Sequence, residues 1–529
     1  MEMQGLGTRS PDPATPCIIE IINGMHTTTF IRCLVFLSLT GFGVLGTWAQ
    51  TSDGEVTLPE SFTAPYIRIT EIEISGNERT KERIITRELD FKLNDSLATF
   101  RDDKRFSPFE QKHFDRVDSS EVVRRMKYSR ENIINTKLFL EVSLSLEEKE
   151  QGGYKLLIDL KERWYFWVFP VLQLDHPNFN DWLNDPDFSR FTQGIFVSHN
   201  NMWGLSHQTS VLGYFGSSTG IGLGYYIPWI GKGQKIGLTL GALYRNSTVV
   251  EYGSLNNERQ IVFDEGSTKE YNFLSTITVR PGLYNYGKLR LTATHLSISD
   301  HLYDLTMSDS LASFLPAGKQ DVSHIDLYVE YSYDTRNNRA YPLKGNFMKG
   351  FVDKKGMGIL GTDVDYFYYG IDMHFYQALS ERWYVAELFS LTSSSGSNIP
   401  YRYKQKLNSG DGFIRGYDYY ALRGDNAYYF RSNIKYNVIK PAILPARKEK
   451  YKDSKFRNLP YAFYLNLIAD LGYVTEDTYR EYNPYNNKLL YSWGIGVDVI
   501  SYYDLVLRFE YMFTSIGTHG FFFGFGMPV

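Results

Sequence analysis

Two glycine-rich stretches have spacings that match chemical motifs. Residues 216–220, GSSTG, match the G-x-S-x-G pattern of a serine nucleophile, and residues 356–361, GMGILG, match the G-x-G-x-x-G pattern of a dinucleotide site. Both patterns require a helix directly after the glycines, because its N-terminus positions the serine or the pyrophosphate. Strand-like alternation follows both stretches instead. We therefore expect a hairpin turn at 216–220, a loop at 356–361, and no enzymatic activity.

The metal-ligating side chains predict no site either. The ten histidines include no pair at metal-ligand spacing, and both cysteines, Cys17 and Cys33, precede the expected cleavage point of a signal peptide. We expect no thiolate site, disulfide, metal or cofactor in the mature chain. A net charge of −4 also argues against a nucleic-acid partner.

One arginine stands in an unusual context. Arg415 lies in GFIRGYDYY, residues 412–420, within a long polar and aromatic stretch between two strand-like segments. A guanidinium enclosed by protein needs a carboxylate within hydrogen-bond reach. Asp470 is the candidate, because it is the acid in an otherwise apolar strand, and Gly472 leaves room for close approach. Gly416 removes a side chain beside the arginine and allows backbone contact with the surrounding wall.

Strands must position this pair. From Trp164 onward, side chains alternate in segments such as 324–333, 464–473 and 505–513, each with one apolar face and one face that carries ions. An aromatic content of 16% and a mean hydropathy of −0.32 fit a transmembrane antiparallel β-barrel. Residues 164–529 are long enough for about sixteen such strands. A soluble secreted β-protein such as a propeller is the alternative, although no internal repeat stands out.

The N-terminal region reads as a targeting segment. The apolar run from Leu34 to Leu45 follows Arg32 and precedes small residues near Ala49, which is typical of a secretory signal peptide. We assign residues 1–50 to the signal region, with Met25 as an alternative start, and residues 51–65 to a linker. An N-terminal membrane anchor is the other interpretation, but the run is shorter than a spanning helix needs.

Residues 66–163 differ from both neighbours and predict a small α/β domain. Residues 66–76 alternate and end in Gly76-Asn77, which indicates a strand and a turn. Two helical segments follow, from Thr80 and near 119–136, separated by a polar stretch at 94–118 that we expect to be a loop. Two further strands are expected at 138–148 and 154–163. The predicted order is β-α-α-β-β.

These stretches resemble a known family. The segment 66–163 resembles a POTRA (polypeptide-transport-associated) domain, and Ile414-Arg415-Gly416-Tyr417 resembles the V/I-R-G-F/Y signature of the outer-membrane barrel-assembly and two-partner-secretion superfamily, the bacterial surface antigen family. In that family the arginine loop inserts into a sixteen-stranded barrel and pairs with a strand acid, here Asp470 with Gly472. A second family-like stretch, 333–347, places the remaining signature residues at the usual spacing: Asp334, Arg336, Pro342 and Gly345.

Three departures from the family pattern affect the expectations. Asn433 stands where many members place an acid, which predicts one acidic partner for the arginine and not two. The chain ends in Met527-Pro528-Val529, so the last strand, expected near 520–529, lacks an aromatic end. A single POTRA-like module differs from the multi-module assembly proteins.

The resemblance implies a function without ATP. The protein would assist the insertion or translocation of polypeptides at the outer membrane, with its POTRA-like domain in the periplasm. Its partners would be outer-membrane lipid, unfolded outer-membrane or secreted polypeptides and accessory lipoproteins. A dedicated two-partner-secretion export pore and a passive diffusion porin are the alternatives.

Overall fold

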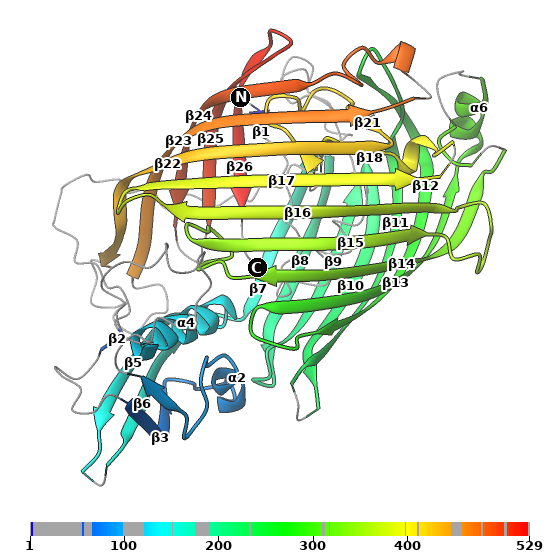
Figure 1. The fold of residues 1–529 in the computed structure, drawn as a ribbon. Helices are drawn as coiled ribbons and strands as arrows, with labels where there is room; N and C mark the ends of the chain where they lie inside the picture. The colour runs from blue at the N-terminus through cyan, green and yellow to red at the C-terminus, as the bar shows by residue number, and fades with distance from the viewer. Residues whose placement is uncertain are drawn as a thin grey trace.

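The computed structural model describes residues 2–3, 56–57, 66–98, 121–150, 152–174, 191–231, 234–308, 313–316, 318–396, 398–409, 412–445, 458–477, 480–501 and 505–526. Two parts are visible: a large curved sheet and a small α/β domain at one of its ends (Figure 1). The signal region, with Met25, Cys17 and Cys33, lies outside the described residues except for Glu2–Met3, which form the short strand β1.

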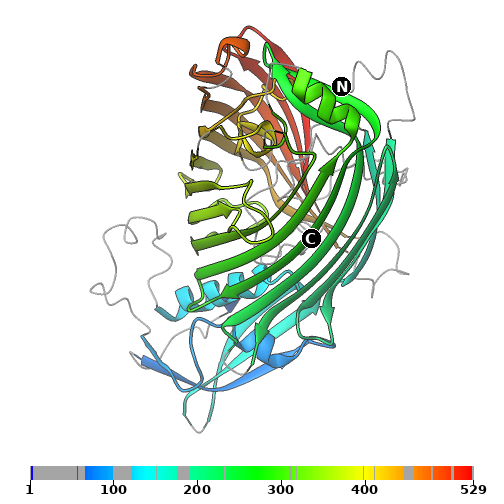
Figure 2. The ribbon, with the colours of Figure 1, turned by 90° about the vertical axis from the view of Figure 1, so that its right-hand side faces the viewer.

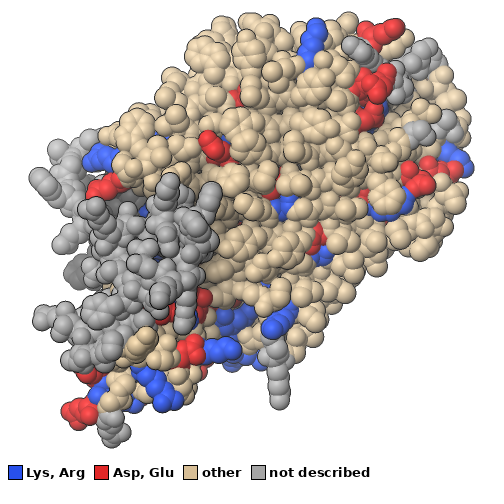
Figure 3. Space-filling view, viewed as in Figure 1, with Lys and Arg blue, Asp and Glu red and all other residues tan. Residues whose placement is uncertain are grey.

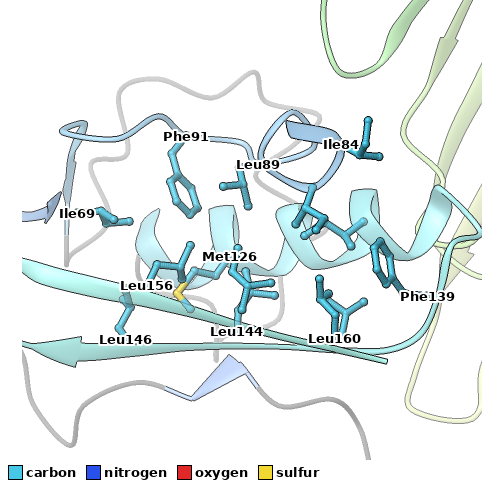
Figure 4. Packing of buried hydrophobic residues seen from close by; sticks show 14 of the residues in the cluster. Ile69, Ile84, Leu89, Phe91, Met126, Phe139, Leu144, Leu146, Leu156 and Leu160 are labelled. Carbon is cyan, nitrogen blue, oxygen red and sulfur yellow. The ribbon is translucent and has the colours of Figure 1, made fainter. Parts of the chain in front are cut away.

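The α/β domain has five strands in the order β2-β5-β6-β3-β4. Its elements are β2 (Val56–Thr57), β3 (Tyr66–Ser75), α2 (Glu82–Thr86), β4 (Ser96–Ala98), α4 (Glu121–Asn135), β5 (Phe139–Glu148) and β6 (Tyr154–Glu162). Alternation along the strands turns Leu144, Leu156 and Ile158 toward the helices, where they meet Ile84 and Met126 in one buried cluster (Figure 4). This core holds the two helices on one face of the sheet.

Two short strands correct the expectation for this domain. Ser96–Ala98, inside the stretch expected to be a loop, pair with Tyr66–Arg68, and Val56–Thr57, inside the expected linker, pair with Leu144–Ser145. Each strand has only two or three residues, too few for a visible alternation of apolar and polar side chains. The structure therefore adds a strand at each edge of the predicted sheet.

The large sheet is an antiparallel barrel of sixteen strands, as the alternating pattern predicted. Its strands are β7 (Phe166–Leu174), β8 (Phe191–Met202), β9 (His207–Gly216), β10 (Ser218–Ile230), β11 (Ile236–Leu255), β12 (Glu258–Val279), β13 (Asn285–Ile298), β14 (Asp321–Asp334), β15 (Gly345–Lys355), β16 (Tyr366–Ala378), β17 (Trp383–Ser395), β22 (Asn426–Pro445), β23 (Asn458–Thr475), β24 (Leu490–Ile500), β25 (Val506–Thr514) and β26 (His519–Gly526). They curve around a common interior (Figure 2). Residues 527–529, expected to extend the last strand, lie outside the described part of the chain.

The two faces of the barrel strands differ as expected for a lipid-facing wall. On β23, Leu465, Leu467 and Leu471 are 50%, 55% and 42% exposed, whereas Asn466 and Asp470 are 5% and 1% exposed. The outer surface of the barrel accordingly carries few charged residues (Figure 3). None of the helices in the described part of the chain has the length and apolar character that a membrane-crossing helix needs.

Both glycine-rich stretches are connections between strands. Ser217 alone separates β9 from β10, so 216–220 is a tight hairpin. Residues 356–361 lie between β15 and β16 and are followed by a strand. Neither stretch leads into a helix.

Candidate functional site

The connection between β17 and β22, residues 396–425, folds into the barrel. It contains a 3-10 turn, η3 (Tyr401–Tyr403), and four two-residue strands: β18 (Gln405–Lys406), β19 (Asn408–Ser409), β20 (Gly412–Phe413) and β21 (Arg423–Gly424). We call this segment the inturned loop. It carries the Ile414-Arg415-Gly416-Tyr417 tetrad, and each of these four residues is buried.

Arg415 meets Asp470 in a two-pronged ion pair. The Arg415 Nε donates to Asp470 Oδ2 at 2.7 Å, Nη2 donates to Oδ1 at 2.5 Å, and the backbone N–H of Arg415 donates to Oδ2 at 3.0 Å. The two residues are 2% and 1% exposed. Parallel bonds of this kind fix both the position and the direction of the guanidinium.

A second acid corrects the expectation of a single acidic partner. Arg415 Nη1 donates to Glu510 Oε1 on β25 at 3.2 Å and to Asn433 Oδ1 on β22 at 2.8 Å. Asn433 therefore keeps a hydrogen bond in the position where an acid was expected, while β25 supplies the second charge. The sequence shows Glu510 on the ionic face of its strand, but it does not show that β25 passes beside Arg415.

Glycines and close packing hold the rest of the tetrad. Gly416 has a φ of +92°, and a Cβ atom there would lie 2.9 Å from Thr514 Cγ2. A Cβ at Gly472 would lie 2.8 Å from Ile414 Cγ2, so this glycine makes room for the isoleucine and not for the arginine. The Tyr417 hydroxyl donates to the Tyr491 backbone oxygen at 2.8 Å. The loop tip is thus packed against β23, β24 and β25.

The same barrel matches a known domain. Residues 201–527, more than half of the chain, match the Omp85 superfamily domain. This chain belongs to the Omp85 superfamily. The family assignment agrees with the resemblance seen in the sequence and places the barrel in the outer membrane.

Solved structures that are similar to this chain include a BamA and a CdiB. BamA from Haemophilus ducreyi lacking POTRA domains 1–3 has 15% sequence identity and a TM-score of 0.44, with 87% of this chain and 84% of that chain covered. CdiB from Escherichia coli has 12% identity and a TM-score of 0.46, with 89% of each chain covered. No curated protein matches this sequence.

The base of the inturned loop is held by three further ion pairs in the Omp85 barrel. Lys404 Nζ lies 2.6 Å from Glu476 Oε2, Arg423 Nη2 lies 2.8 Å from Glu251 Oε1, and Arg402 Nη2 lies 3.1 Å from Glu270 Oε2. Glu251 and Glu270 lie on β11 and β12, whereas Glu476 follows β23. The loop is therefore anchored to walls on both sides of the lumen.

The tip of the β11–β12 hairpin contacts both the inturned loop and the segment that follows β23. Asn257 donates from its backbone N–H to Asn483 Oδ1 at 2.8 Å, and its Oδ1 accepts from the Tyr485 N–H at 2.8 Å. Its backbone oxygen accepts from the Ala421 N–H at 2.6 Å. The strands β11 and β23 are eight strands apart in either direction around the barrel. The hairpin tip therefore reaches across the mouth to the opposite wall.

The family stretch at 334–345 forms a turn at the other end of the barrel. Arg336 Nε and Nη2 each lie 2.8 Å from a different oxygen of Asp334. Pro342 is buried, and Gly345 has a φ of +94° that brings its Cα beside the Thr335 backbone oxygen. A side chain at Gly345 would collide with that oxygen, because an ideal Cβ would lie 2.1 Å from it. This turn faces the α/β domain, and Asn135 contacts it through Asn337 and Arg339.

Residues in or beside four connections between barrel strands contact the α/β domain. These are the connections after β8, β10, β12 and β14. The Lys81 N–H donates to the Gly204 oxygen at 2.9 Å, and Asn201 Nδ2 donates to Thr80 Oγ1 at 2.9 Å. Glu88, directly after α2, makes a two-pronged ion pair with Arg280 at 2.7 and 2.8 Å. Trp229 belongs to the same buried cluster as the core of the domain. Sequence reasoning missed this junction, since its partners are up to about two hundred residues apart.

The described residues contain no group of three His, Cys, Asp or Glu side chains that could hold a metal ion. The buried charges of the site are instead paired arginines, lysines and carboxylates. This arrangement can fix segments in place. We call Arg415 with Asp470, Glu510 and Asn433 the lock, because their bonds fix the inturned loop inside the barrel.

Proposed function

We propose that this Omp85 protein assists polypeptides in inserting into or crossing the outer membrane without ATP. One observation carries the proposal: a POTRA-like α/β domain is docked at one end of a barrel whose interior holds a loop fixed by ion pairs. The domain would receive unfolded polypeptides in the periplasm, and the barrel would deliver them. Accessory lipoproteins are expected to dock on the domain.

The physical task is to satisfy the backbone of an incoming strand. Unpaired N–H and C=O groups are costly in lipid, and an open sheet edge can pair with them. The strand order brings the last barrel strand, β26, next to the first, β7. The last strand β26 also pairs with the short strand β1 at Phe522 and Phe523.

This junction is where we expect the barrel to part. Pro170 of β7 lies opposite Ile195 of β8 and has no N–H to donate, which weakens the ladder beside the junction. Arg415 and its acids would then brace the loop while the junction moves. Pro528, which we expect to act in the same way on the last strand, lies outside the described residues.

Depletion of the protein, followed by a census of outer-membrane and secreted proteins, tests the proposal. Broad loss of outer-membrane proteins would identify an assembly factor, whereas loss of one secreted protein would identify a dedicated export pore. An unchanged census would contradict both roles.

A passive diffusion porin is the remaining alternative. A porin does not need a docked α/β domain, whereas this chain has one, and a long loop lies inside its barrel. Conductance of the purified protein in a planar bilayer provides the check. Steady conductance that is unaffected by removal of residues 66–163 would favour the porin.

A further inference from the structure

The glycine-rich stretch 356–361, which leads into a strand and not into a helix, exposes three large apolar side chains. Met357, Ile359 and Leu360 are 41%, 54% and 66% exposed. The stretch connects β15 to β16 at the end of the barrel away from the α/β domain, where α6 (Asp300–Ser308) also lies (Figure 1). Single exposed apolar residues are common on proteins, whereas a group of three indicates an interaction surface. We call residues 356–361 the apolar loop.

The apolar loop is held against β14 by its backbone. The Met357 N–H donates to the Ile325 oxygen at 2.9 Å. Gly361 lies so close to β14 that a Cβ atom there would be 2.5 Å from the Ser323 oxygen. The loop therefore runs alongside β14, and a fixed backbone presents its apolar side chains.

Leu360 has a backbone conformation that leucine rarely adopts. Its φ is +69°, in the left-handed region, where the Cβ atom of an ordinary residue crowds the neighbouring carbonyl oxygen. The same residue is the most exposed of the three apolar side chains. The chain therefore accepts both backbone strain and exposure at one position, and such outliers are concentrated at binding sites. A ligand that covers this leucine would offset its exposure.

The surface next to the apolar loop is the lipid-facing wall of the barrel. On the same hairpin, Val352 and Phe367 are each 44% exposed, and Ile371 is 50% exposed. The Lys354 ammonium lies over the Phe367 ring, 4.5 Å from its centroid, and also pairs with Asp365. A lysine above an exposed aromatic ring is typical of the membrane–water interface, where the charge reaches the headgroups. The interface at this hairpin is therefore expected close to the start of the loop.

The distance along β14 places the loop within the headgroup layer. Lys354 pairs with Leu327, and Gly361 lies beside Ser323, four residues farther along β14. Four residues of a strand tilted by about 45° rise roughly 9 Å toward the surface. The headgroup layer on each side of the hydrocarbon is about 5–8 Å thick. The side chains of the apolar loop can therefore reach lipid without a change of backbone.

We propose that the apolar loop binds a lipid surface, with Met357, Ile359 and Leu360 inserted into the headgroup layer of the leaflet at this end of the barrel. Lipid is favoured over a second protein because the loop is continuous with the lipid-facing side of β15 and β16. Apolar side chains bind to such a layer in proportion to the area that they bury. The contact would fix the height of this hairpin in the membrane. It requires only that the barrel lies in a membrane, not that it handles polypeptides.

Quenching of a dye by spin-labelled lipid tests the proposal on the full chain in phosphatidylcholine vesicles. The dye is attached at Thr362→Cys, which is exposed beside the loop and leaves the three apolar side chains in place, in a chain with Cys17→Ser and Cys33→Ser. Phosphatidylcholine with a nitroxide near its headgroup should reduce the fluorescence about twofold or more. The matched control is a dye at Glu258→Cys, which is exposed at the tip of the β11–β12 hairpin over the mouth and should not respond to the lipid.

Two variants separate insertion of the side chains from mere proximity to lipid. Leu360→Asn removes an apolar side chain, and asparagine tolerates the left-handed backbone better than leucine does. Met357→Asn removes a second apolar side chain at a position without that backbone constraint. Each variant should lower the lipid quenching of the Thr362 dye about two- to threefold. Quenching that is unchanged in both variants would overturn the proposal.

Iodide in the water distinguishes lipid from the other states of the loop. A Thr362 dye that iodide quenches as strongly as the Glu258 dye, with no response to spin-labelled lipid, would show a loop in water and would overturn the proposal. A dye that neither quencher reaches would show a protein cover and would overturn the assignment to lipid. Strong quenching by the lipid and weak quenching by iodide is the expected result.

Discussion

The lumen and the domain junction both contain buried arginines that pair with carboxylates, but the two pairs join different parts of the molecule. In the lumen, Arg415 bonds to Asp470 and Glu510, which lie 55 and 95 positions away in the same barrel. At the junction, Arg280 of the barrel pairs with Glu88 of the α/β domain, 192 positions away. The first pair fixes a loop within one domain, whereas the second holds two domains together.

Removal of the Arg415 side chain from the lock is expected to have the largest effect on stability. Arg415→Ala leaves Asp470 and Glu510 buried without their main cation, so it should lower the free energy of unfolding by about 3–5 kcal/mol. Denaturant unfolding in detergent provides the measurement. Arg382→Ala, at an exposed turn between β16 and β17, is the control and should change stability by less than about 0.5 kcal/mol.

A double-mutant cycle sharpens this test. Asp470→Asn alone should also destabilise the barrel, and the combination with Arg415→Ala should cost less than the sum of the two single changes. Additive losses would show that the two residues act separately, and the barrel would then need another explanation for the inturned loop.

Glu88→Gln should have the next largest effect, at the junction. It leaves Arg280 with a neutral partner and should weaken docking of the domain by about 2–3 kcal/mol, less than in the lumen because a cavity of about 70 Å³ beside Glu88 and Arg280 can admit water. Hydrogen exchange of α2 and of the turn at 280–284 is the measurement. Protection equal to that of the wild type would show that the apolar contact at Trp229 holds the domain without the ion pair.

Gly472→Ala tests whether the lock also depends on shape. The added Cβ would lie 2.8 Å from Ile414 Cγ2 and 2.9 Å from Leu407 Cδ2, so we expect a loss of about 1–2 kcal/mol. A Cβ at Gly213 on β9 meets no atom within 4 Å, which makes Gly213→Ala the matched control. Equal stability of the two variants would contradict tight packing of the loop tip.

Lowering the pH is expected to have the smallest effect on docking of the α/β domain. The Glu88 carboxyl is buried, which opposes ionisation, but Arg280 and Arg87 outweigh the burial and lower its pKa below the ordinary value. Its contribution to docking is therefore fully present above the ordinary pKa near 4.5 and is lost as the pH falls through the lower folded value. Energy transfer between dyes on the domain and the barrel should fall only in that acidic range, and Glu88→Gln should flatten this response.

The sequence contains most of the information for the lock and little for the junction. Arg415, Gly416, Asp470 and Gly472 stand out because a charge or a glycine interrupts an apolar alternation. Glu510 has the same signal, but only the register of β23 with β24 and of β24 with β25 brings it beside Arg415. Sequence spacing does not contain that register.

At the junction between the α/β domain and the barrel, neither Glu88 nor Arg280 is unusual in its own segment. Glu88 follows a short amphipathic helix, and Arg280 follows a strand at the start of a turn, where charged residues are common. Their meeting depends on how the domain docks, which pairs residues 192 positions apart. The short strands β2 and β4 were missed for a related reason, since pairing with a neighbour defines them and their own pattern does not.

The contact of Asn257 across the mouth has a consequence for how the protein folds. Asn257, at the tip of the hairpin, bonds at once to Ala421 of the inturned loop and to the segment after β23, and its bond to Asn483 spans 226 residues. The Ala421 contact can exist only when the inturned loop is inside the barrel. We therefore expect the contacts across the mouth to be completed together with, or after, entry of the loop.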